Sequence, residues 1–113
     1  MRHIESQLQK NCLTWFKLQF PSHVIHSIPN GGRRGKIEAA IMKAEGVLAG
    51  CADLFVMASS GFYNGLYIEM KTEKGRQTNS QKWFEKKATD FGYKYAVCRS
   101  FDEFKKTIEE YLK

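Results

Sequence analysis

Two short segments, DLFVM at residues 53–57 and LYIEMK at residues 66–71, decide the fold of this chain. The first has four apolar residues in succession after the aspartate, which predicts a strand covered on both faces. The second alternates, so that Tyr67, Glu69 and Lys71 share one face of a strand. The residues between the segments include serines, glycines and an asparagine, which favour turns. We therefore expect the two segments to form a β-hairpin.

Helices and strands are predicted on both sides of this hairpin. Capping-box sequences, TNSQ at residues 78–81 and SFDE at residues 100–103, indicate where two helices begin. Gly46 and Gly92 are placed to end two helices in the left-handed conformation, and the first helix must end by Pro21. We expect helices over residues 4–18, 37–44, 78–91 and 101–112, and strands over residues 23–28, 54–57, 66–71 and 94–98.

Apolar residues at helical spacing indicate which side chains the helices bury. Each helix shows one such stripe, and we expect its aromatic members to belong to the core. The stripes are Ile4, Leu8, Cys12, Trp15 and Leu18 in the first helix, Ile37, Ala40, Ile41 and Ala44 in the second, and Trp83, Phe84, Ala88 and Phe91 in the third.

The order α-β-α-β-β-α-β-α places the chain in the α/β class, with a small mixed sheet flanked by helices. The strand at 94–98 follows the strand at 66–71 through a helix, which implies a right-handed crossover and parallel pairing. The length of 113 residues is that of one domain, and no linker or repeat interrupts it. We therefore expect residues 1–113 to form a single domain.

The composition of the chain predicts its cellular compartment and its class of partner. No run approaches the roughly 20 apolar residues of a membrane span, and the N-terminus lacks an apolar signal core, so we expect a cytoplasmic protein. Cys12, Cys51 and Cys98 lie too far apart for a zinc site and are expected to be buried thiols. The net charge of +6 is compatible with a nucleic-acid partner and equally with an ordinary lysine-rich surface.

Asp53, Glu69 and Lys71 form the candidate site. Glu69 and Lys71 emerge on one strand face, and Asp53 begins the neighbouring strand, so two carboxylates and an ammonium can converge. Hard cations such as Mg²⁺ bind through a few carboxylates together with water and substrate phosphates. The three residues are equally consistent with a strand cap and an exposed ion pair on a solvated face.

A wider set of motifs resembles the VRR-Nuc family of the PD-(D/E)xK nuclease superfamily, in particular its small stand-alone phage and bacterial members. The motifs are GVLAGCADLFV at residues 46–56, YIEMK at 67–71, SQKWF at 80–84, IPNGG at 28–32 and KAEG at 43–46. One departure is Ala52, which stands where the family usually has proline before the motif aspartate. The resemblance implies a restriction-endonuclease-like core and a metal-dependent DNA endonuclease.

The resemblance also implies roles for single residues. Asp53 and Glu69 would be metal ligands for one or two Mg²⁺ or Mn²⁺ ions, the Met70 carbonyl would add a backbone ligand, and Lys71 would be the catalytic lysine. The family's further acidic residue from the first helix falls on Glu5. For Glu5 the alternative is an interaction with the N-terminal end of the helix dipole.

Gln81 matches the family's glutamine after the lysine, where it would steady the site or a phosphate. The capping box is its competing role, and the two roles are compatible. Phosphate binding is expected from basic residues beside a glycine turn and near the site, although each alone is also an ordinary solvated side chain. These residues are Arg33, Arg34, Lys36, Lys74, Arg76 and Lys82.

Phe62 and Tyr63 lie at the predicted hairpin tip, where they cannot contribute to the core. They are candidates to stack on nucleic acid or on a second subunit.

The resemblance points to branched DNA as substrate, with a homodimer resolving four-way (Holliday) junctions by paired cuts. Two alternatives remain open at this point. One is a less selective nuclease or nickase in phage replication or recombination. The other is a DNA-binding module of the same fold that does not cleave. The setting would be the cytoplasm of a bacterial or phage-infected cell.

Overall fold

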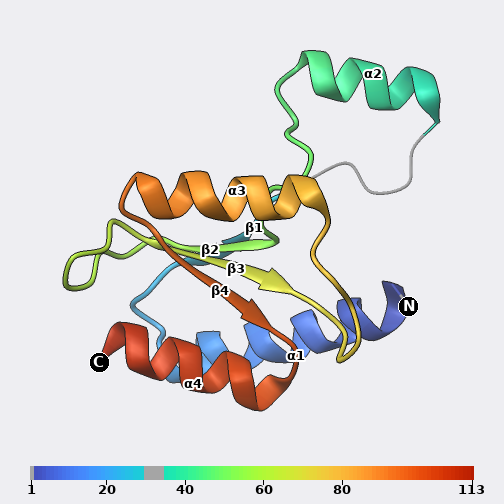
Figure 1. The fold of residues 1–113 in the computed structure, drawn as a ribbon. Helices are drawn as coiled ribbons and strands as arrows, with labels where there is room; N and C mark the ends of the chain where they lie inside the picture. Colours follow the sequence, from blue (N-terminus) through green and yellow to red (C-terminus); the bar gives the residue numbers. More distant parts are fainter. Residues whose placement is uncertain (1, 30–34) are drawn as a thin grey trace.

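The computed structural model describes residues 2–29 and 35–113, and it contains one mixed sheet with helices on both faces (Figure 1). The elements follow the predicted order. They are α1 (Arg2–Gln19), β1 (Ile25–Ser27), α2 (Lys36–Ala44), β2 (Leu54–Val56), β3 (Leu66–Met70), α3 (Asn79–Asp90), β4 (Lys94–Cys98) and α4 (Phe101–Leu112).

The sheet has the strand order β1-β2-β3-β4. Strands β2 and β3 form the predicted antiparallel hairpin, with Leu54 opposite Ile68. Strands β3 and β4 pair in parallel, with Glu69 opposite Val97, so the predicted crossover is confirmed. Strand β1 is shorter than the predicted 23–28, and it pairs with β2 only over the three residues that face Leu54–Val56.

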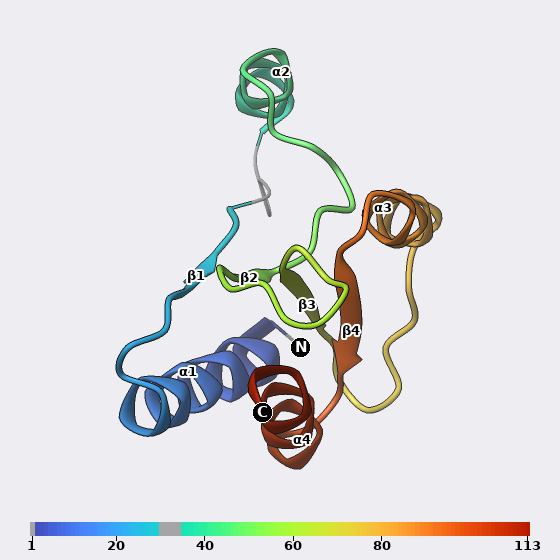
Figure 2. The same cartoon turned by 90° about the vertical axis from the view of Figure 1, so that its left-hand side faces the viewer.

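Helices α1 and α4 cover one face of the sheet, and α3 covers the other (Figure 2). The apolar core lies on the α1–α4 side, because alternate residues of each strand point there. Its largest fully buried apolar side chains are Phe16, Phe104, Leu54, Leu66, Ile68 and Ile108. The intervening strand residues, such as Tyr67 and Tyr95, lie on the opposite sheet face, where they form an aromatic layer beneath α3 with Phe84.

The predicted stripe of α1 is wrong at its C-terminal end. Leu18 is 73% exposed, whereas Phe16 is fully buried four residues after the buried Cys12. A helix turns about 100° per residue, so Leu18 lies roughly 200° around the axis from Phe16. The stripe continues from Cys12 through Phe16, and Trp15 packs at its margin against Phe101 and Phe104 of α4.

Helix α2 stands apart from the rest of the molecule (Figure 1). None of its residues is buried, and the predicted stripe residues Ile37 and Ile41 are 78% and 51% exposed. Gly46 ends the helix as predicted, with a φ of 104° that a residue with a Cβ rarely adopts. The expectation that α2 buries an apolar face is therefore wrong for the described part of the chain, where none of the α2 side chains is buried.

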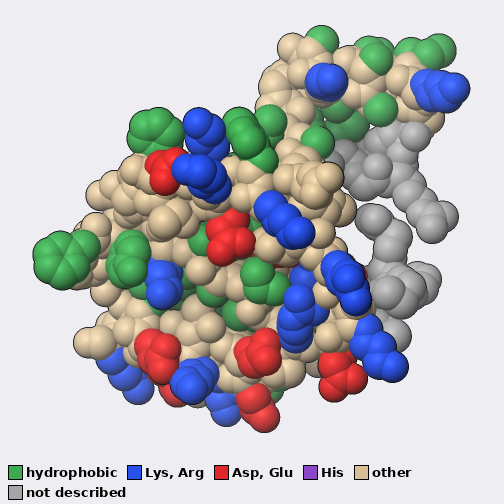
Figure 3. Space-filling model, in the orientation of Figure 1, with side chains coloured by type: hydrophobic (Ala, Val, Ile, Leu, Met, Phe, Trp, Pro, Cys, Tyr) green, Lys and Arg blue, Asp and Glu red, His purple; other side chains and the backbone are tan. Residues whose placement is uncertain are grey.

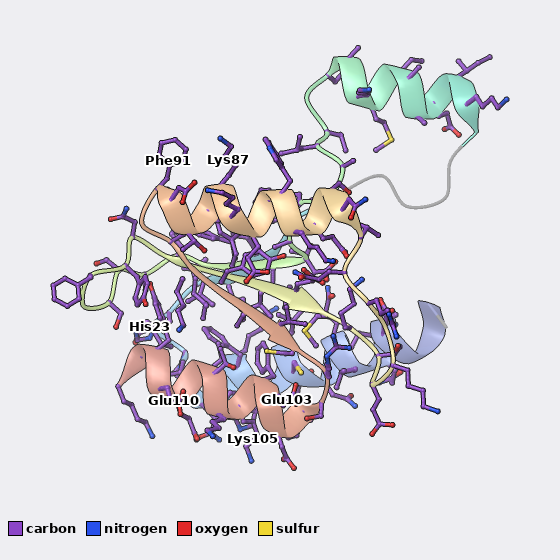
Figure 4. The ribbon with its side chains drawn as sticks, viewed as in Figure 1. His23, Lys87, Phe91, Glu103, Lys105 and Glu110 are labelled. Atoms are coloured by element: carbon purple, nitrogen blue, oxygen red, sulfur yellow. The ribbon has the colours of Figure 1, made fainter. Side chains whose placement is uncertain are left out.

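Helix α3 begins as predicted. Thr78 accepts a hydrogen bond from the Gln81 N–H, and Gln81 accepts one in return from the Thr78 N–H. Its outer face is less buried than the stripe predicted, since Trp83 is 50% and Phe91 71% exposed. Phe91 and Lys87 point away from the sheet (Figure 4).

Helix α4 has half of its predicted capping box. The Ser100 hydroxyl accepts from the Glu103 N–H, but the Glu103 carboxylate accepts from the backbone N–H of Arg99 in place of that of Ser100.

Two of the three thiols are buried as expected, Cys12 and Cys98, and Cys51 is partly buried. Burial raises the pKa of the Cys12 thiol to about 12, so it stays protonated at neutral pH. Among the described helices, none has the length and apolar character to cross a bilayer.

Candidate active site

Asp53 is held in place from both sides at the start of β2. Its N–H donates to the Ile68 carbonyl at 3.0 Å, and its own carbonyl accepts from the Ile28 N–H at 2.8 Å. Its side-chain Oδ2 accepts from the backbone N–H of Met70 at 2.7 Å. The loop before it passes close to α3, because Gly50 has a φ of 86° and lies where a Cβ would meet the Ser80 backbone. The carboxylate is thus tied to the end of β3.

Glu69 is the one buried charged side chain among the described residues, with 1% of its surface exposed. It lies on the sheet face beneath α3, two residues before Lys71. The Lys71 Nζ lies 3.8 Å from Glu69 Oε2, and its side chain is 13% exposed. The structure therefore brings Asp53, Glu69 and Lys71 together, and burial rules out the exposed ion pair that the sequence left open.

The two oxygens of the Glu69 carboxylate differ. Oε1 accepts a hydrogen bond from the Tyr95 hydroxyl at 2.5 Å and another from Gln77 Nε2 at 3.0 Å. Oε2 is buried and has no hydrogen-bond partner among the described residues. A buried carboxylate oxygen without a donor is costly unless something else occupies its lone pairs. A cation is the natural counterpart for such an oxygen.

Electrostatics link Glu5 to this site. Burial raises the pKa of Asp53, and the negative charges of Glu69 and Glu5 raise it further. The Met70 N–H and the Lys71 ammonium act in the opposite direction. Glu5 of α1, the position that the resemblance implies for a further acidic residue, is therefore close enough to act on Asp53 through its charge.

Gln77 and Tyr95 are the site residues that the sequence reasoning missed. Gln77 lies in an irregular loop six residues after Lys71, where no periodicity marks it. Tyr95 carried a usable signal, because parallel pairing sets it beside Tyr67 and on the same face as Glu69. Burial and the hydrogen bond to Glu69 raise the pKa of Tyr95 far above its usual value, so it acts as a hydrogen-bond donor.

Gln81 takes part in the capping box of α3, and neither of its described hydrogen bonds goes to Asp53 or Glu69. Its Oε1 accepts from the Thr78 N–H at 2.8 Å, which leaves only its Nε2 for other partners. Gln77, in the loop before the helix, is the glutamine that contacts Glu69. The capping role weighed for Gln81 is therefore shown.

The expected phosphate-binding residues fall into two groups. Lys74, Arg76 and Lys82 are exposed around the start of α3, and basic side chains gather over the loop between β3 and α3 (Figure 3). Lys36 begins α2, away from the carboxylates, and Arg33 and Arg34 lie outside the described residues.

Arg99 secures the loop that follows Lys71. Its Nη1 donates to the carbonyls of Thr72, Glu73 and Gly75, with distances of 3.0, 3.4 and 2.5 Å. A guanidinium presents several donors in a fixed plane, which suits it to gather carbonyls in this way. Arg99 at the end of β4 thereby restrains the chain between Lys71 and Gln77.

The donors present fit a hard divalent cation. In the described parts of the chain, no cluster of three or more His, Cys, Asp and Glu side chains could hold a metal by itself. Mg²⁺ commonly uses one or two carboxylates and takes its other ligands from water and substrate phosphate. Asp53 and Oε2 of Glu69, which has no hydrogen-bond partner among the described residues, meet that need, and the Met70 carbonyl follows directly after Glu69 in the chain.

A separate cavity of about 540 Å³ lies against β4 and α4, and Phe62, Tyr63, Lys94 and Glu110 are among its lining residues. Phe62 is 99% exposed, and the Lys94 Nζ lies 5.5 Å from the centre of the Tyr63 ring. Neither Asp53 nor Glu69 lines this cavity.

Comparison with known proteins agrees with this geometry. The model of a family described as VRR-NUC domain matches residues 2–102. A solved structure described as a VRR_NUC domain protein superposes with a TM-score of 0.82 and is 30% identical in sequence. That match covers 96% of this chain and 87% of the other. No curated protein matches the chain.

Proposed function

The chain belongs to the VRR-NUC family of nuclease domains and has a restriction-endonuclease-like fold, and from this premise we propose that it is a metal-dependent endonuclease acting on branched DNA. The observation that carries the proposal is the buried Glu69 Oε2, which has no hydrogen-bond donor among the described residues and lies 3.8 Å from the Lys71 ammonium. An oxygen that the protein leaves without a donor is available to a metal ion, whereas a fully hydrogen-bonded one is not.

In this proposal Asp53 and Glu69 hold one or two Mg²⁺ or Mn²⁺ ions, with the Met70 carbonyl and Glu5 as further ligands. The bound ion supplies Lewis acidity toward the phosphoryl group and lowers the pKa of a water. The Met70 N–H keeps Asp53 Oδ2 in place, so that Oδ1 is the oxygen left for the ion.

Lys71 has a separate task. Its ammonium lies beside the carboxylates and is mostly shielded from solvent, so its charge is weakly screened there. It orients the attacking water in line with the scissile bond and offsets the negative charge that develops on the phosphate. Loss of its charge is expected to slow cleavage without removing the metal ligands.

DNA is held by phosphate contacts. Lys74, Arg76 and Lys82 are the proposed contacts near the carboxylates, and Gln81 Nε2, which the capping box leaves free, would donate to the same phosphates. Arg33, Arg34 and Lys36 extend this contact along the substrate. Contacts of this kind give affinity without base recognition, in keeping with a substrate chosen by shape.

Four-way junctions are the proposed substrate, and a homodimer is the proposed active form. One site cuts one strand, whereas resolution needs two symmetrical cuts, which a two-fold dimer supplies. The net charge of +6 supports binding to the dense phosphates of a junction.

The test compares the wild-type protein with Lys71→Ala on labelled four-way junction, flap, duplex and single-stranded DNA, in Mg²⁺, Mn²⁺ or EDTA. Lys106→Ala, an exposed lysine on α4, is the matched control. Paired, metal-dependent cuts confined to the junction and absent only in Lys71→Ala are the expected result. Equal cutting of every substrate would reject the junction preference and favour a less selective nuclease. Binding without cutting would reject the proposal that the protein is an enzyme.

A further inference from the structure

The Glu69 carboxylate is held by donors that all lie on one of its oxygens. The Tyr95 hydroxyl and the Gln77 amide both donate to Oε1, at 2.5 and 3.0 Å, while Oε2 receives no donor from the described residues. The two oxygens are chemically equivalent, but rotation about the terminal bond by less than a half-turn swings the plane of the carboxylate and moves its free oxygen. The position of the donors therefore sets the plane of the carboxylate and the direction in which the oxygen without a donor points, which is toward Lys71.

Both donors are themselves fixed. Gln77 Nε2 carries two hydrogens, and the second bond goes to Glu85 Oε1 on α3 at 2.9 Å, so its amide is held between two carboxylates. Tyr95 belongs to β4, and its ring packs against Phe84 of α3, with 6.2 Å between ring centres. The two donors come from different segments and bind the same oxygen, so either one still restrains Glu69 when the other is removed.

We propose that Gln77 and Tyr95 are positioning residues that set the affinity of the site for its divalent ion by fixing the plane of the Glu69 carboxylate, with its free oxygen on the side of Lys71. This inference rests on the proposed function. Neither side chain contacts the ion; each acts through Glu69. Hydrogen-bonding partners of metal ligands are worth about 10- to 100-fold in metal affinity or activity when removed.

The variants remove the donors and keep the shapes. Tyr95→Phe deletes one hydroxyl, and Gln77→Met replaces the amide by an apolar side chain of similar length. Tyr93→Phe is the matched control, because Tyr93 packs in the same aromatic layer against Phe55 and Tyr67, and none of its described contacts involves Glu69. Binding of Mn²⁺ alone is measured by calorimetry without DNA, and stability by urea unfolding.

We expect each single variant to weaken Mn²⁺ binding about tenfold, and the double variant to weaken it by more than the product of the two. The excess arises because either donor alone still favours the native orientation. Cleavage by each variant should recover at raised Mn²⁺, which shows that KM for the ion and not kcat has changed. Tyr93→Phe should bind Mn²⁺ like the wild type.

Wild-type affinity in both single variants and the double variant would overturn the positioning role. The positioning role would also be rejected if each variant lost Mn²⁺ binding only in proportion to its unfolded fraction, because that loss would be a structural effect. If the wild type itself neither binds Mn²⁺ nor cleaves DNA, the proposed function fails. If the wild type binds Mn²⁺ and cleaves DNA, and the variants do so equally well, only the positioning role is rejected.

Discussion

The Asp53 carboxylate accepts a hydrogen bond from the backbone N–H of Met70, with 2.7 Å between Asp53 Oδ2 and the Met70 nitrogen. Met70 stands between Glu69 and Lys71, so this one bond aligns the start of β2 with the end of β3. It also occupies one oxygen of Asp53 and leaves the other for a ligand. The geometry of the site therefore depends on main-chain register as much as on side-chain identity.

Replacing Glu69 by alanine is expected to abolish cleavage and to preserve or strengthen DNA binding. The change removes a proposed metal ligand and, at the same time, a negative charge that repels phosphate. Cleavage assays and fluorescence anisotropy with a labelled four-way junction measure the two effects. Cleavage at the wild-type rate would remove Glu69 from the site.

Asp53→Asn should stabilise the metal-free protein at neutral pH while it destroys metal binding. Because burial raises the pKa of Asp53 above its value in the unfolded chain, the folded state binds more protons between the two values. Its stability therefore falls as pH rises through that window, and the loss remains at every pH above it. Asparagine can still accept from the Met70 N–H and avoids this loss.

Melting temperatures of Asp53→Asn and the wild type in EDTA test whether the substitution raises stability. They are compared at pH 7 and well below pH 3.8, the ordinary pKa of an aspartate. The gain should be present at pH 7 and absent at the acidic pH, where Asp53 is protonated in both states. A gain of equal size at both would assign it to a cause other than ionisation.

Arg99→Ala should lower the free energy of unfolding by about 1–3 kcal/mol and slow cleavage as well. It removes the guanidinium donor shared by three carbonyls of the loop after Lys71. Arg99→Lys is expected to recover only part of the stability and of the cleavage rate, since all three bonds come from Nη1 and the shorter lysine side chain does not place its ammonium at that position. Urea unfolding and cleavage rates per folded molecule provide the measurement, with Lys106→Ala as the control. Full recovery in Arg99→Lys would reject the proposed dependence of the loop on the Arg99 guanidinium.

Replacement of isoleucine by alanine should change the free energy of unfolding much more in the core than in α2. Ile108→Ala is expected to cost about 2–5 kcal/mol, because the side chain is fully buried among α1, α4 and the sheet. Ile37→Ala, at a 78% exposed position, should change stability by no more than about 0.5 kcal/mol. Both values come from urea unfolding of the isolated protein. A large loss from Ile37→Ala would mean that α2 is covered in solution.

Gln81 and Thr78 form a matched pair, because each contributes one half of the capping box. Alanine at either position should cost about 0.5–2 kcal/mol of stability. Only Gln81→Ala is also expected to weaken DNA binding, by removing the Nε2 proposed to face a phosphate. Anisotropy with duplex DNA under folded conditions separates the two. Equal affinity in both variants would leave Gln81 with the capping role alone.

Features that depend on neighbouring residues were predictable. The hairpin follows from turn formers between two extended segments, and the capping box at 78–81 from the side chains that complete it. The parallel pairing of β3 with β4 follows from the intervening helix. Burial was predicted less well, as Leu18 and Ile41 show, because periodicity marks an apolar face without stating whether another element covers it.

For the site, the sequence by itself determined that Glu69 and Lys71 share a strand face and that Asp53 lies on the adjacent strand, since alternation is a property of the local backbone. Only the tertiary structure decided which oxygen of Glu69 is occupied. That depends on Tyr95, 26 residues away, and on Gln77, whose loop carries no pattern. Hydrogen bonds of this kind need angles and distances that only packing of α3 against the sheet establishes.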